Sequence, residues 1–321
     1  MKERAMNSRF QQLLTKYGTI LALVIVTLMF SLFVPGFVNS RNLLNILRQV
    51  ALLAVIAEGF TMCLIVDELD LSFANVASLA SVIAGALILG GMHPFLAIVI
   101  VLAVGAGIGL LNGLLVTKVG IPSLITTLAM GIISVGFIYM FTDGLSLYGA
   151  MPAGFLFLGR GSIAGIPFLV IIMFAVVLLA HVLVNKFKVG KYMQATGANV
   201  RAARLAGINT DFYKILGLVL SSAGAALTGI LLTSRLGTAN PEGATGFMMD
   251  SFASALMGMT VLSIGRAKPL GTLVGVLMIG VISNGMTLAG APYYMQDITK
   301  GVIILLSVTI TSLQSKRQAD A

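Results

Sequence analysis

Glu58 is the residue of this chain whose position most clearly suggests chemistry. It lies near the middle of an apolar run, residues 51–66. In a membrane, a charged side chain at that depth costs about 3 kcal/mol unless it faces a cavity or a partner. Its carboxyl group could line a polar path through a helical bundle, or it could carry a proton or a sodium ion. We favour a path role for Glu58 over simple packing.

Other polar side chains also interrupt apolar stretches or adjoin them. The set of candidates for lining a path is Glu58, Asp70, Ser72, Asn75, Asn112, Asp250 and Asn284. The alternative is that these groups make interhelical hydrogen bonds, each worth about 0.6 kcal/mol. For each asparagine we favour this structural interpretation.

Residues 195–209 form a short, basic, helix-like segment between two long apolar runs, 168–184 and 215–232. In a membrane protein such an insertion suggests a contact surface for a soluble partner. An ordinary charged loop is the alternative, since short motifs carry a high risk of false positives.

Enzyme and metal chemistry find no support in the sequence, so we predict no catalytic residues and no cofactor bound by this chain. A phosphate-binding loop and a Gly-x-Ser-x-Gly elbow are both absent. Cys63 is the single cysteine and there are two histidines, so neither a disulfide nor a zinc site is expected. An intramembrane protease would need acids on facing helices. Asp67 and Asp70 are too close together in sequence for this, although Asp250 could supply a second one.

The composition identifies the setting of these residues. Hydrophobic residues make up 58% of the chain, charged residues 10%, and the mean hydropathy is +1.03. Soluble domains carry about 25% charged residues. Apolar runs of about 20 residues, the length that crosses a bilayer as a helix, recur throughout. We therefore predict one integral membrane domain over residues 1–321, all-α and polytopic.

About ten spans can be counted. They cover residues 17–34, 46–66, 71–90, 95–116, 122–141, 167–184, 213–234, 247–264, 270–288 and 298–313. The first lacks the short core and the cleavage site of a signal peptide. The acidic cluster at residues 67–70 is either a tight cytoplasmic turn or part of a broken helix. A buried break would need its backbone groups satisfied by protein or water.

The distribution of basic residues predicts the orientation. With an even number of spans both termini lie on one side, and that side would hold most of the 20 Lys and Arg residues. The other side keeps only Arg41, Arg48, Arg160, Arg235 and Lys300. The positive-inside rule then places both termini in the cytoplasm. This asymmetry accounts for the net charge of +9, so nucleic-acid binding is not expected.

Two glycine patterns predict close helix packing. Gly105, Gly109 and Gly113 lie along one face of a helix, and Gly271 and Gly275 repeat the pattern near the other end. Small residues at this spacing allow two helix backbones to approach each other. The pattern does not distinguish a transporter from other helical bundles.

Several segments, in this order and spacing, resemble the permease subunits of bacterial ATP-binding-cassette sugar importers, the ribose-type permease family. They are Pro35-Gly-Phe-Val-Asn-Ser-Arg-Asn-Leu-Leu-Asn-Ile-Leu47, Glu68-Leu-Asp-Leu-Ser72, Asn112-Gly113, Ile121-Pro-Ser-Leu-Ile-Thr-Thr-Leu128, Gly190-Lys-Tyr192 and Ala202-Ala-Arg-Leu-Ala-Gly-Ile208. The second is similar to the family's Gly-Ile-Asp-Leu-Ser motif. The last two are the most specific, and the resemblance covers nearly the whole chain.

The resemblance implies a fold of the type II importer kind in the bacterial inner membrane. It implies a second permease subunit, two cytoplasmic ATP-binding subunits that use the ATP, and a periplasmic substrate-binding protein. Residues 186–212 would be the cytoplasmic coupling segment that docks on the ATPase. Because Arg201 and Arg204 are three residues apart, they would share a helical face and suit acidic groups or carbonyls there. The candidate coupling residues are Asn199, Arg201, Ala202, Arg204, Leu205 and Gly207.

The sequence also departs from the family pattern. Ala74 stands where a glycine is usual, and Gly258-Met-Thr-Val-Leu262 with the following residues 263–269 differs from a glycine-rich family segment. Residues 240–247 keep the expected form more closely. Larger side chains at glycine positions should alter packing or turn geometry. They raise the hypothesis that this chain pairs with a different permease rather than with itself.

The function predicted is that of a permease for a ribose-like monosaccharide or a related polyol. A branched-chain amino-acid permease of the same transporter class is the alternative substrate group. An ion-coupled secondary transporter that uses Glu58 or Asp70 is a further alternative. The basic segment discriminates these classes, because a secondary transporter needs no docking helix. The absence of Trp argues against a high-affinity sugar site in this chain, since no indole is available to stack on a sugar ring.

Overall fold

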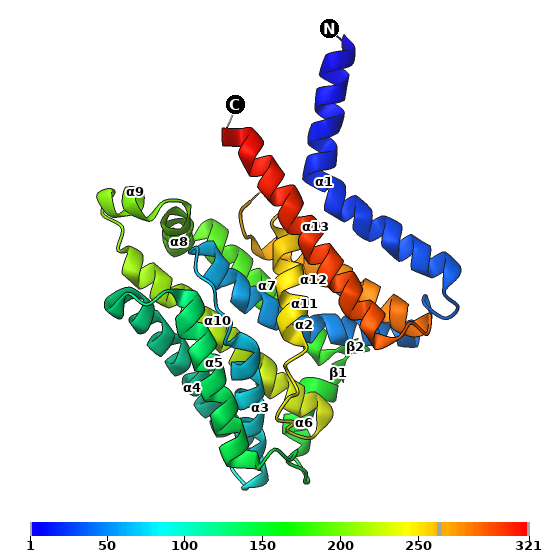
Figure 1. The fold of residues 1–321 in the computed structure, drawn as a ribbon. Helices are drawn as coiled ribbons and strands as arrows, with labels where there is room; N and C mark the ends of the chain where they lie inside the picture. The colour runs from blue at the N-terminus through cyan, green and yellow to red at the C-terminus, as the bar shows by residue number, and fades with distance from the viewer. Residues whose placement is uncertain (1, 262–264, 320–321) are drawn as a thin grey trace. The chain divides into compact units, whose positions relative to one another are not determined.

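The computed structural model of the protein describes residues 2–261 and 265–319, and most of them are helical (Figure 1). The helices, in chain order, are α1 (Lys2–Phe33), α2 (Ser40–Ile65), α3 (Phe73–Leu89), α4 (Pro94–Leu114), the π-helix η1 (Leu115–Val119), α5 (Ser123–Thr142), α6 (Ala153–Arg160), α7 (Phe168–Lys186), α8 (Lys188–Ala198), α9 (Val200–Leu205), α10 (Thr210–Leu236), α11 (Phe247–Gly258), α12 (Pro269–Leu288) and α13 (Tyr293–Ala319). Strands β1 (Ser162–Ile163) and β2 (Ile166–Pro167) form a small antiparallel hairpin before α7.

Six of these helices are long and apolar enough to cross a bilayer: α2, α4 with η1, α5, α7, α10 and α12. Two shorter apolar helices are Gly18–Phe33 and α3. These helices confirm an all-α polytopic membrane protein, while the count of ten spans and the cytoplasmic termini stay predictions.

The eighth predicted span differs from the structure. Residues 247–264 were expected to cross as one helix, but α11 has 12 residues and ends at Gly258. That is about 18 Å of helix, against a hydrocarbon core of about 30 Å. Residues 262–264, which the predicted span and the family departure both include, lie outside the described residues.

The chain forms two compact units, and each is described by itself. Unit 1 comprises Met1–Val50 with Phe252–Ala321, and unit 2 comprises Ala51–Ser251. The sequence alone predicts a single membrane domain and contains no linker that marks this division.

In unit 2, α10 is the central helix, and α2, α3 and α4 pack against it (Figure 1). The contact with α4 is made by the predicted glycine face. A Cβ at Gly109 would lie 2.5 Å from the Leu218 carbonyl oxygen, and one at Gly113 would lie 2.8 Å from the Ile215 Cα. Gly59 of α2 and Gly224 of α10 likewise bring two backbones together. The prediction of close packing on this face is confirmed.

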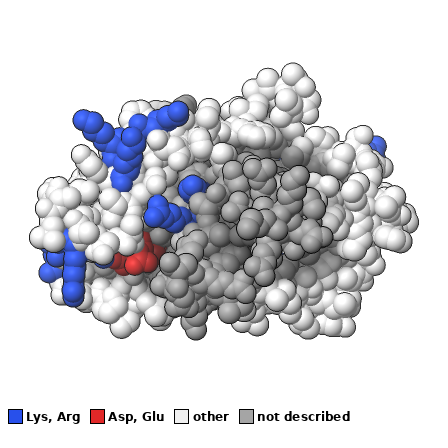
Figure 2. Space-filling view, turned by 90° about the horizontal axis from the view of Figure 1, so that it is seen from above, with Lys and Arg blue, Asp and Glu red and all other residues white. Residues whose placement is uncertain are grey.

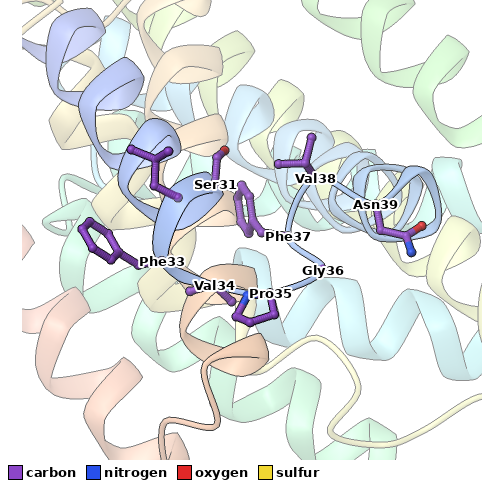
Figure 3. Close-up of a pocket in the computed structure, with 9 residues that line it drawn as sticks. Ser31, Phe33, Val34, Pro35, Gly36, Phe37, Val38 and Asn39 are labelled. Carbon is purple, nitrogen blue, oxygen red and sulfur yellow. The ribbon is translucent and has the colours of Figure 1, made fainter.

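In unit 1, α12 packs closely on the end of α11 and on α1. Gly271 lies against Gly258, and Gly275 lies against Ser254, so the second glycine pattern also marks a helix contact. The ring of Phe30 covers Gly285. The connection between α1 and α2 encloses a pocket of about 300 Å³, lined by the continuous segment from Ser31 to Asn39 (Figure 3).

Candidate functional site

The basic segment predicted as a coupling element folds into α8, α9 and the first turn of α10. Asn199 caps α9, because its side-chain oxygen accepts a hydrogen bond from the Ala202 N–H at 2.9 Å. Gly207 ends the helix with φ +80, a left-handed conformation that favours glycine. Asn209 then caps α10 by accepting from the Phe212 N–H at 3.1 Å. Two asparagine caps and one glycine thus make a rigid helical corner.

The outer face of this corner is exposed and mixed in character. Leu205 is 90% exposed, whereas Ala203 on the opposite side of α9 is buried. Arg201 is exposed and has no hydrogen-bond or ion-pair partner among the described residues. Figure 2 shows Lys and Arg side chains gathered over the α8 and α9 region, beside a small acidic patch. An exposed leucine among free cations is typical of a surface that a partner covers.

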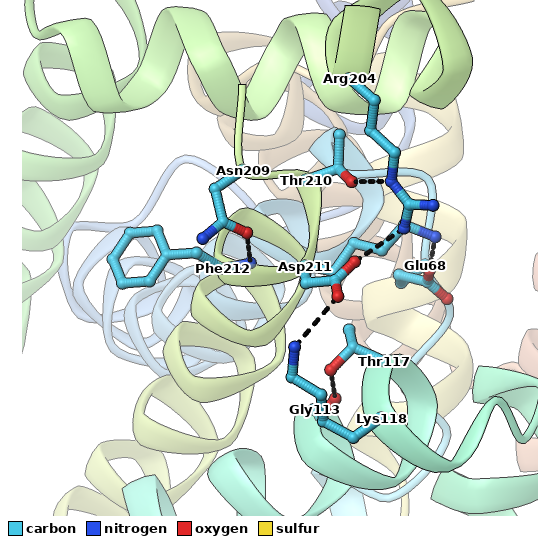
Figure 4. Close-up of polar contacts among 10 residues, drawn as sticks. Glu68, Gly113, Thr117, Lys118, Arg204, Asn209, Thr210, Asp211 and Phe212 are labelled. Carbon is cyan, nitrogen blue, oxygen red and sulfur yellow. Dashed lines mark hydrogen bonds and ion pairs between the residues drawn. The ribbon is translucent and has the colours of Figure 1, made fainter. Parts of the chain in front are cut away.

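Arg204 behaves differently from Arg201, although both were predicted to share one outward face. Its Nε donates to the Thr210 Oγ1 at 2.8 Å, and its Nη2 donates to the Asp211 Oδ1 at 2.8 Å (Figure 4). Lys118 at the end of α4 and η1 donates to the other oxygen of Asp211 at 3.1 Å. Arg204 therefore attaches α9 to the first turn of α10, and Lys118 attaches η1 to the same aspartate.

A hollow of about 410 Å³ lies beside α9. It is lined by Tyr192, Tyr213 and residues 206–209. The two tyrosine rings meet edge to face with centroids 5.6 Å apart. The exposed helix α9 projects from the surface, and the hollow beside it has aromatic walls. A single partner could contact both.

The acidic cluster between α2 and α3 forms a hydrogen-bonded break. The Leu69 N–H donates to Ser123 Oγ at 3.2 Å, and the Leu71 N–H donates to Thr127 Oγ1 at 3.0 Å. The Thr127 hydroxyl group, which donates to the Ser123 carbonyl oxygen at 2.8 Å, also lies 3.3 Å from the Leu69 carbonyl oxygen. The first turns of α5 thus satisfy the backbone of the break, as a break within a bundle requires. Both alternatives for this cluster, a tight cytoplasmic turn and a broken helix, stay predictions.

Lys214 of α10 connects this break to the coupling segment. Its ammonium group pairs with the carboxylate of Glu68, which is buried in the break. Lys214 lies three residues after Asp211, so the start of α10 pairs with Arg204 and Lys118 through Asp211 and with Glu68 through Lys214, one turn further on. We call these six residues, Glu68, Lys118, Arg204, Thr210, Asp211 and Lys214, the polar network (Figure 4). It consists of two groups, the Glu68–Lys214 pair and the group around Asp211, which share the start of α10.

Close backbone contacts support the same connection. A Cβ at Gly197 of α8 would overlap the carbonyl oxygen of Ile65, the last residue of α2. A Cβ at Gly217 of α10 would lie 2.6 Å from a methyl carbon of Val66. The coupling segment and α10 therefore both lie directly against the start of the break.

Three of the predicted path residues lie together in unit 2. Ser72 donates to the Asp70 Oδ1 through both its backbone N–H, at 2.9 Å, and its hydroxyl group. Asn112 of α4 donates to the Ser72 hydroxyl at 3.2 Å. All three side chains are fully buried, so this chain of hydrogen bonds holds α4 against the break. Their role as path residues stays a prediction.

The remaining polar candidates lie apart from that group. Asn284 in unit 1 makes a reciprocal amide pair with Asn42, at 2.9 and 3.0 Å, as the interhelical interpretation predicts. Asn75 is half-buried on α3 and faces Gly131 of α5. Asp250 lies half-buried in the first turn of α11.

Glu58 occupies a different environment again. Its side chain is 1% exposed and lines a pocket of about 460 Å³ formed by α2, α4, α7 and α10. Neither carboxyl oxygen has a hydrogen-bond partner among the described residues. The structure therefore does not join Glu58 to Asp70 and Ser72, and no contact tests its predicted role in a path.

Sequence reasoning missed most of the polar network. Lys118, Asp211 and Lys214 were visible as charged residues at the ends of apolar runs, which is where interfacial charges normally lie. Their pairing joins positions 93 and 146 residues apart, and no spacing rule links such positions. Ser123 and Thr127 gave a weaker signal as hydroxyl residues in a short polar stretch.

Comparison with known proteins gives consistent matches over nearly the whole chain. Residues 42–308 match the family model described as "Branched-chain amino acid transport system / permease component". The chain is 36% identical to the ribose import permease protein RbsC of Bacillus subtilis, over 95% of both chains. It is 33% identical to RbsC of Escherichia coli K12, over 92% of this chain and 94% of that one. It is also 31% identical to the D-allose transport system permease protein AlsC of that organism, over 94% and 93%. No solved structure matches.

Proposed function

Because the chain belongs to the branched-chain amino acid transport system permease family, we propose that it is the membrane-spanning subunit of an ATP-driven sugar importer. Such a chain is a transport subunit and not an enzyme. The sugar is proposed because the relatives described above are named for ribose and allose import. The observation that carries the proposal on the structural side is the exposed α9 corner, held on the ends of helices that can cross a membrane.

The partners follow from the same family. We propose two cytoplasmic ATP-binding subunits, a second permease subunit and a periplasmic protein that delivers the sugar. The location would be the inner membrane of a bacterium, with both termini in the cytoplasm. The chain itself would bind no cofactor, and the ATP would be used by the partner subunits.

The contact with the ATPase is proposed to lie on the outer face of α9. Leu205 would insert into an apolar recess of the ATPase, and Arg201 would meet an acidic side chain or carbonyl group beside it. Asn199 and Gly207 would shape the corner, and Ala202 would leave room for the partner. Arg204 would act inside this chain, because its guanidinium group is already engaged by Thr210 and Asp211.

The polar network then supports a route by which docking reaches the bundle. A displacement of α9 would move Arg204 and hence the first turn of α10. Lys214, one turn further along α10, holds Glu68 in the break between α2 and α3. Through this turn, closure of the ATPase would shift the break and the Asp70, Ser72 and Asn112 group behind it. This is a rigid-element coupling of the kind that transporters use for alternating access.

The proposal can be tested by isolating the complex and changing the docking face. The tagged permease is solubilised from its native membrane, and co-purifying chains are identified by mass. Leu205→Asp should abolish recovery of the ATP-binding subunits, because it places a charge in an apolar contact. Leu145→Asp is the matched control, since Leu145 is also strongly exposed but lies between α5 and α6. Equal recovery in both variants would refute docking on α9.

Substrate class is tested separately in proteoliposomes that contain the complete complex. We expect ATP-dependent uptake of a labelled pentose or hexose delivered by the co-purified binding protein. Uptake of leucine with no sugar uptake would support the branched-chain amino-acid alternative. Uptake by the permease alone, driven by a proton or sodium gradient, would overturn the importer proposal.

A further inference from the structure

The Glu58 pocket has an unusual composition for a site inside a transporter. Apart from Glu58, every side chain that lines it is apolar, and the residues come from α2, α4, α7 and α10, with Phe187 from the junction of α7 and α8. They include Met62, Leu102, Leu183 and Leu227. The volume of about 460 Å³ lies within the range of small-molecule sites. Such walls favour an apolar occupant.

The carboxyl group of Glu58 determines which polar group a ligand in this pocket would need. It is almost completely buried, and neither oxygen has a hydrogen-bond partner among the described residues. The pocket lining contains no Lys, Arg or His that could supply one. A buried carboxyl group without a partner is costly, so a donor supplied by a ligand would be strongly favoured.

A sugar is poorly suited to this pocket. Each sugar hydroxyl would need a partner, and the walls offer one carboxyl group in total. Ordered water is disfavoured for the same reason, because a buried water normally makes about three hydrogen bonds. A ligand with a single hydrogen-bond donor group would satisfy the carboxyl group of Glu58.

The pocket can be reached from the outside of unit 2 along α7. Leu179, which lines the pocket, is itself 69% exposed, and its neighbour Leu178 is 62% exposed on the same helix. Because α7 is apolar and long enough to span a bilayer, these exposed leucines are suited to hydrocarbon. Glu58 lies about two turns from the end of α2, roughly 10 Å along the helix, so a head group need not reach the bilayer centre.

We propose that this pocket binds an amphiphile from the membrane, with one apolar tail against the leucine walls and one hydrogen-bond-donating head, an amine or hydroxyl group, at Glu58. The site is distinct from the docking face of α9. It does not depend on the proposed transport function.

The chain contains no Trp, which allows a single introduced indole to report on the pocket. Leu179→Trp places it in the lining, and Leu178→Trp is a matched control at an exposed position outside the lining. The probe is dodecylamine brominated in its tail, since bromine quenches a nearby indole. In detergent micelles we expect saturable quenching at position 179 and only gradual, non-saturable quenching at position 178.

The role of Glu58 is tested in the Leu179→Trp background. Glu58→Met keeps the volume of the side chain and removes the acceptor, so the apparent affinity for the amine should fall at least about tenfold. Brominated dodecane, which has no head group, should quench both forms equally and without saturation. If Glu58→Met does not fold, displacement of the brominated amine by plain dodecylamine but not by dodecane makes the same test.

Three results would overturn the proposal. One is equal quenching at positions 178 and 179. Another is an unchanged affinity in Glu58→Met. The third is saturable quenching that appears only after the protein is dissociated into monomers, because a second copy of the chain would then be the occupant.

Discussion

Glu58 and Glu68 are carboxylic acids at the two sides of the end of α2, and their surroundings are opposite. Glu68 is buried and pairs with the ammonium group of Lys214, close in sequence to the group in which Asp211 binds Arg204 and Lys118. Glu58 is buried against apolar walls, with no donor among the described residues. The carboxylate of Glu68 has its partner within this chain, whereas the carboxyl group of Glu58 would obtain one only from a bound ligand. The two glutamates therefore differ in role although they are the same residue type, and the difference lies in whether a partner is present.

The two regions also differ in how tightly they are packed, which allows the largest predicted contrast. Gly197→Val should destabilise the protein by about 3 kcal/mol or more, because the new side chain would overlap the carbonyl oxygen of Ile65. Ala223→Leu adds bulk to the wall of the Glu58 pocket and should change stability by less than about 1 kcal/mol. Thermal unfolding of both variants in one detergent makes the comparison. Equal losses would mean that the pocket is already filled.

A second contrast removes one charged group from each region. Lys214→Met should cost about 2 kcal/mol or more, because it leaves the buried carboxylate of Glu68 without its partner. Glu58→Met should cost nothing and can raise stability, since it removes a carboxyl group that has no partner. The free energy of unfolding, measured by titration with a denaturing detergent, should fall in Lys214→Met and should stay the same or rise in Glu58→Met.

The control for that contrast is Lys214→Met combined with Glu68→Gln. Removing the second charge should restore most of the lost stability. No recovery would show that Lys214 stabilises the protein through packing and not through its charge.

A third prediction concerns the outer part of the polar network. Arg204→Ala and Lys118→Ala should each cost less than about 1 kcal/mol, since both side chains are mostly exposed. The effects should shrink at high salt and should not be additive, because both residues bind Asp211. Arg201→Ala, which has no partner among the described residues, is the control and should leave stability unchanged. A cost for Arg201→Ala equal to that of Arg204→Ala would contradict the distinction between them.

The smallest effect is expected at Asp67, beside the paired region. Burial raises the pKa of this carboxyl group, the charge of Glu68 raises it further, and Lys214 opposes both. A raised pKa in the folded state means that the ionised form opposes folding at neutral pH. Asp67→Asn should therefore be slightly stabilising at pH 7, and the gain should vanish as the pH falls from the raised pKa of Asp67 to the range in which an ordinary aspartate titrates.

Asn also tolerates the left-handed backbone at position 67, where φ is +60. Asp143→Asn, at another exposed position with positive φ, controls for any effect on the backbone alone. Melting temperatures measured across pH for the two variants would contradict the prediction if their curves were parallel.

Much of the architecture was predictable from local patterns. Composition and the length of the apolar runs predicted an all-α membrane protein, and the spacing of Gly105, Gly109 and Gly113 predicted a face that another helix approaches. The basic segment was correctly predicted to be helical and flanked by apolar helices. The extent of α11 was not, because the apolar run continues past Gly258, where the helix ends against Gly271 of α12.

The sequence by itself determined the class of protein, the helical segments and the glycine faces, because these follow from hydropathy and period over neighbouring residues. Only the tertiary structure decided which polar groups meet. Arg204 points inward to Asp211 while Arg201 does not, and Glu68 finds Lys214 while Glu58 finds an apolar pocket. The physical reason is that the two residues of such a pair are 93 or 146 positions apart in the sequence. Helix packing brings them together, and no local pattern encodes that packing.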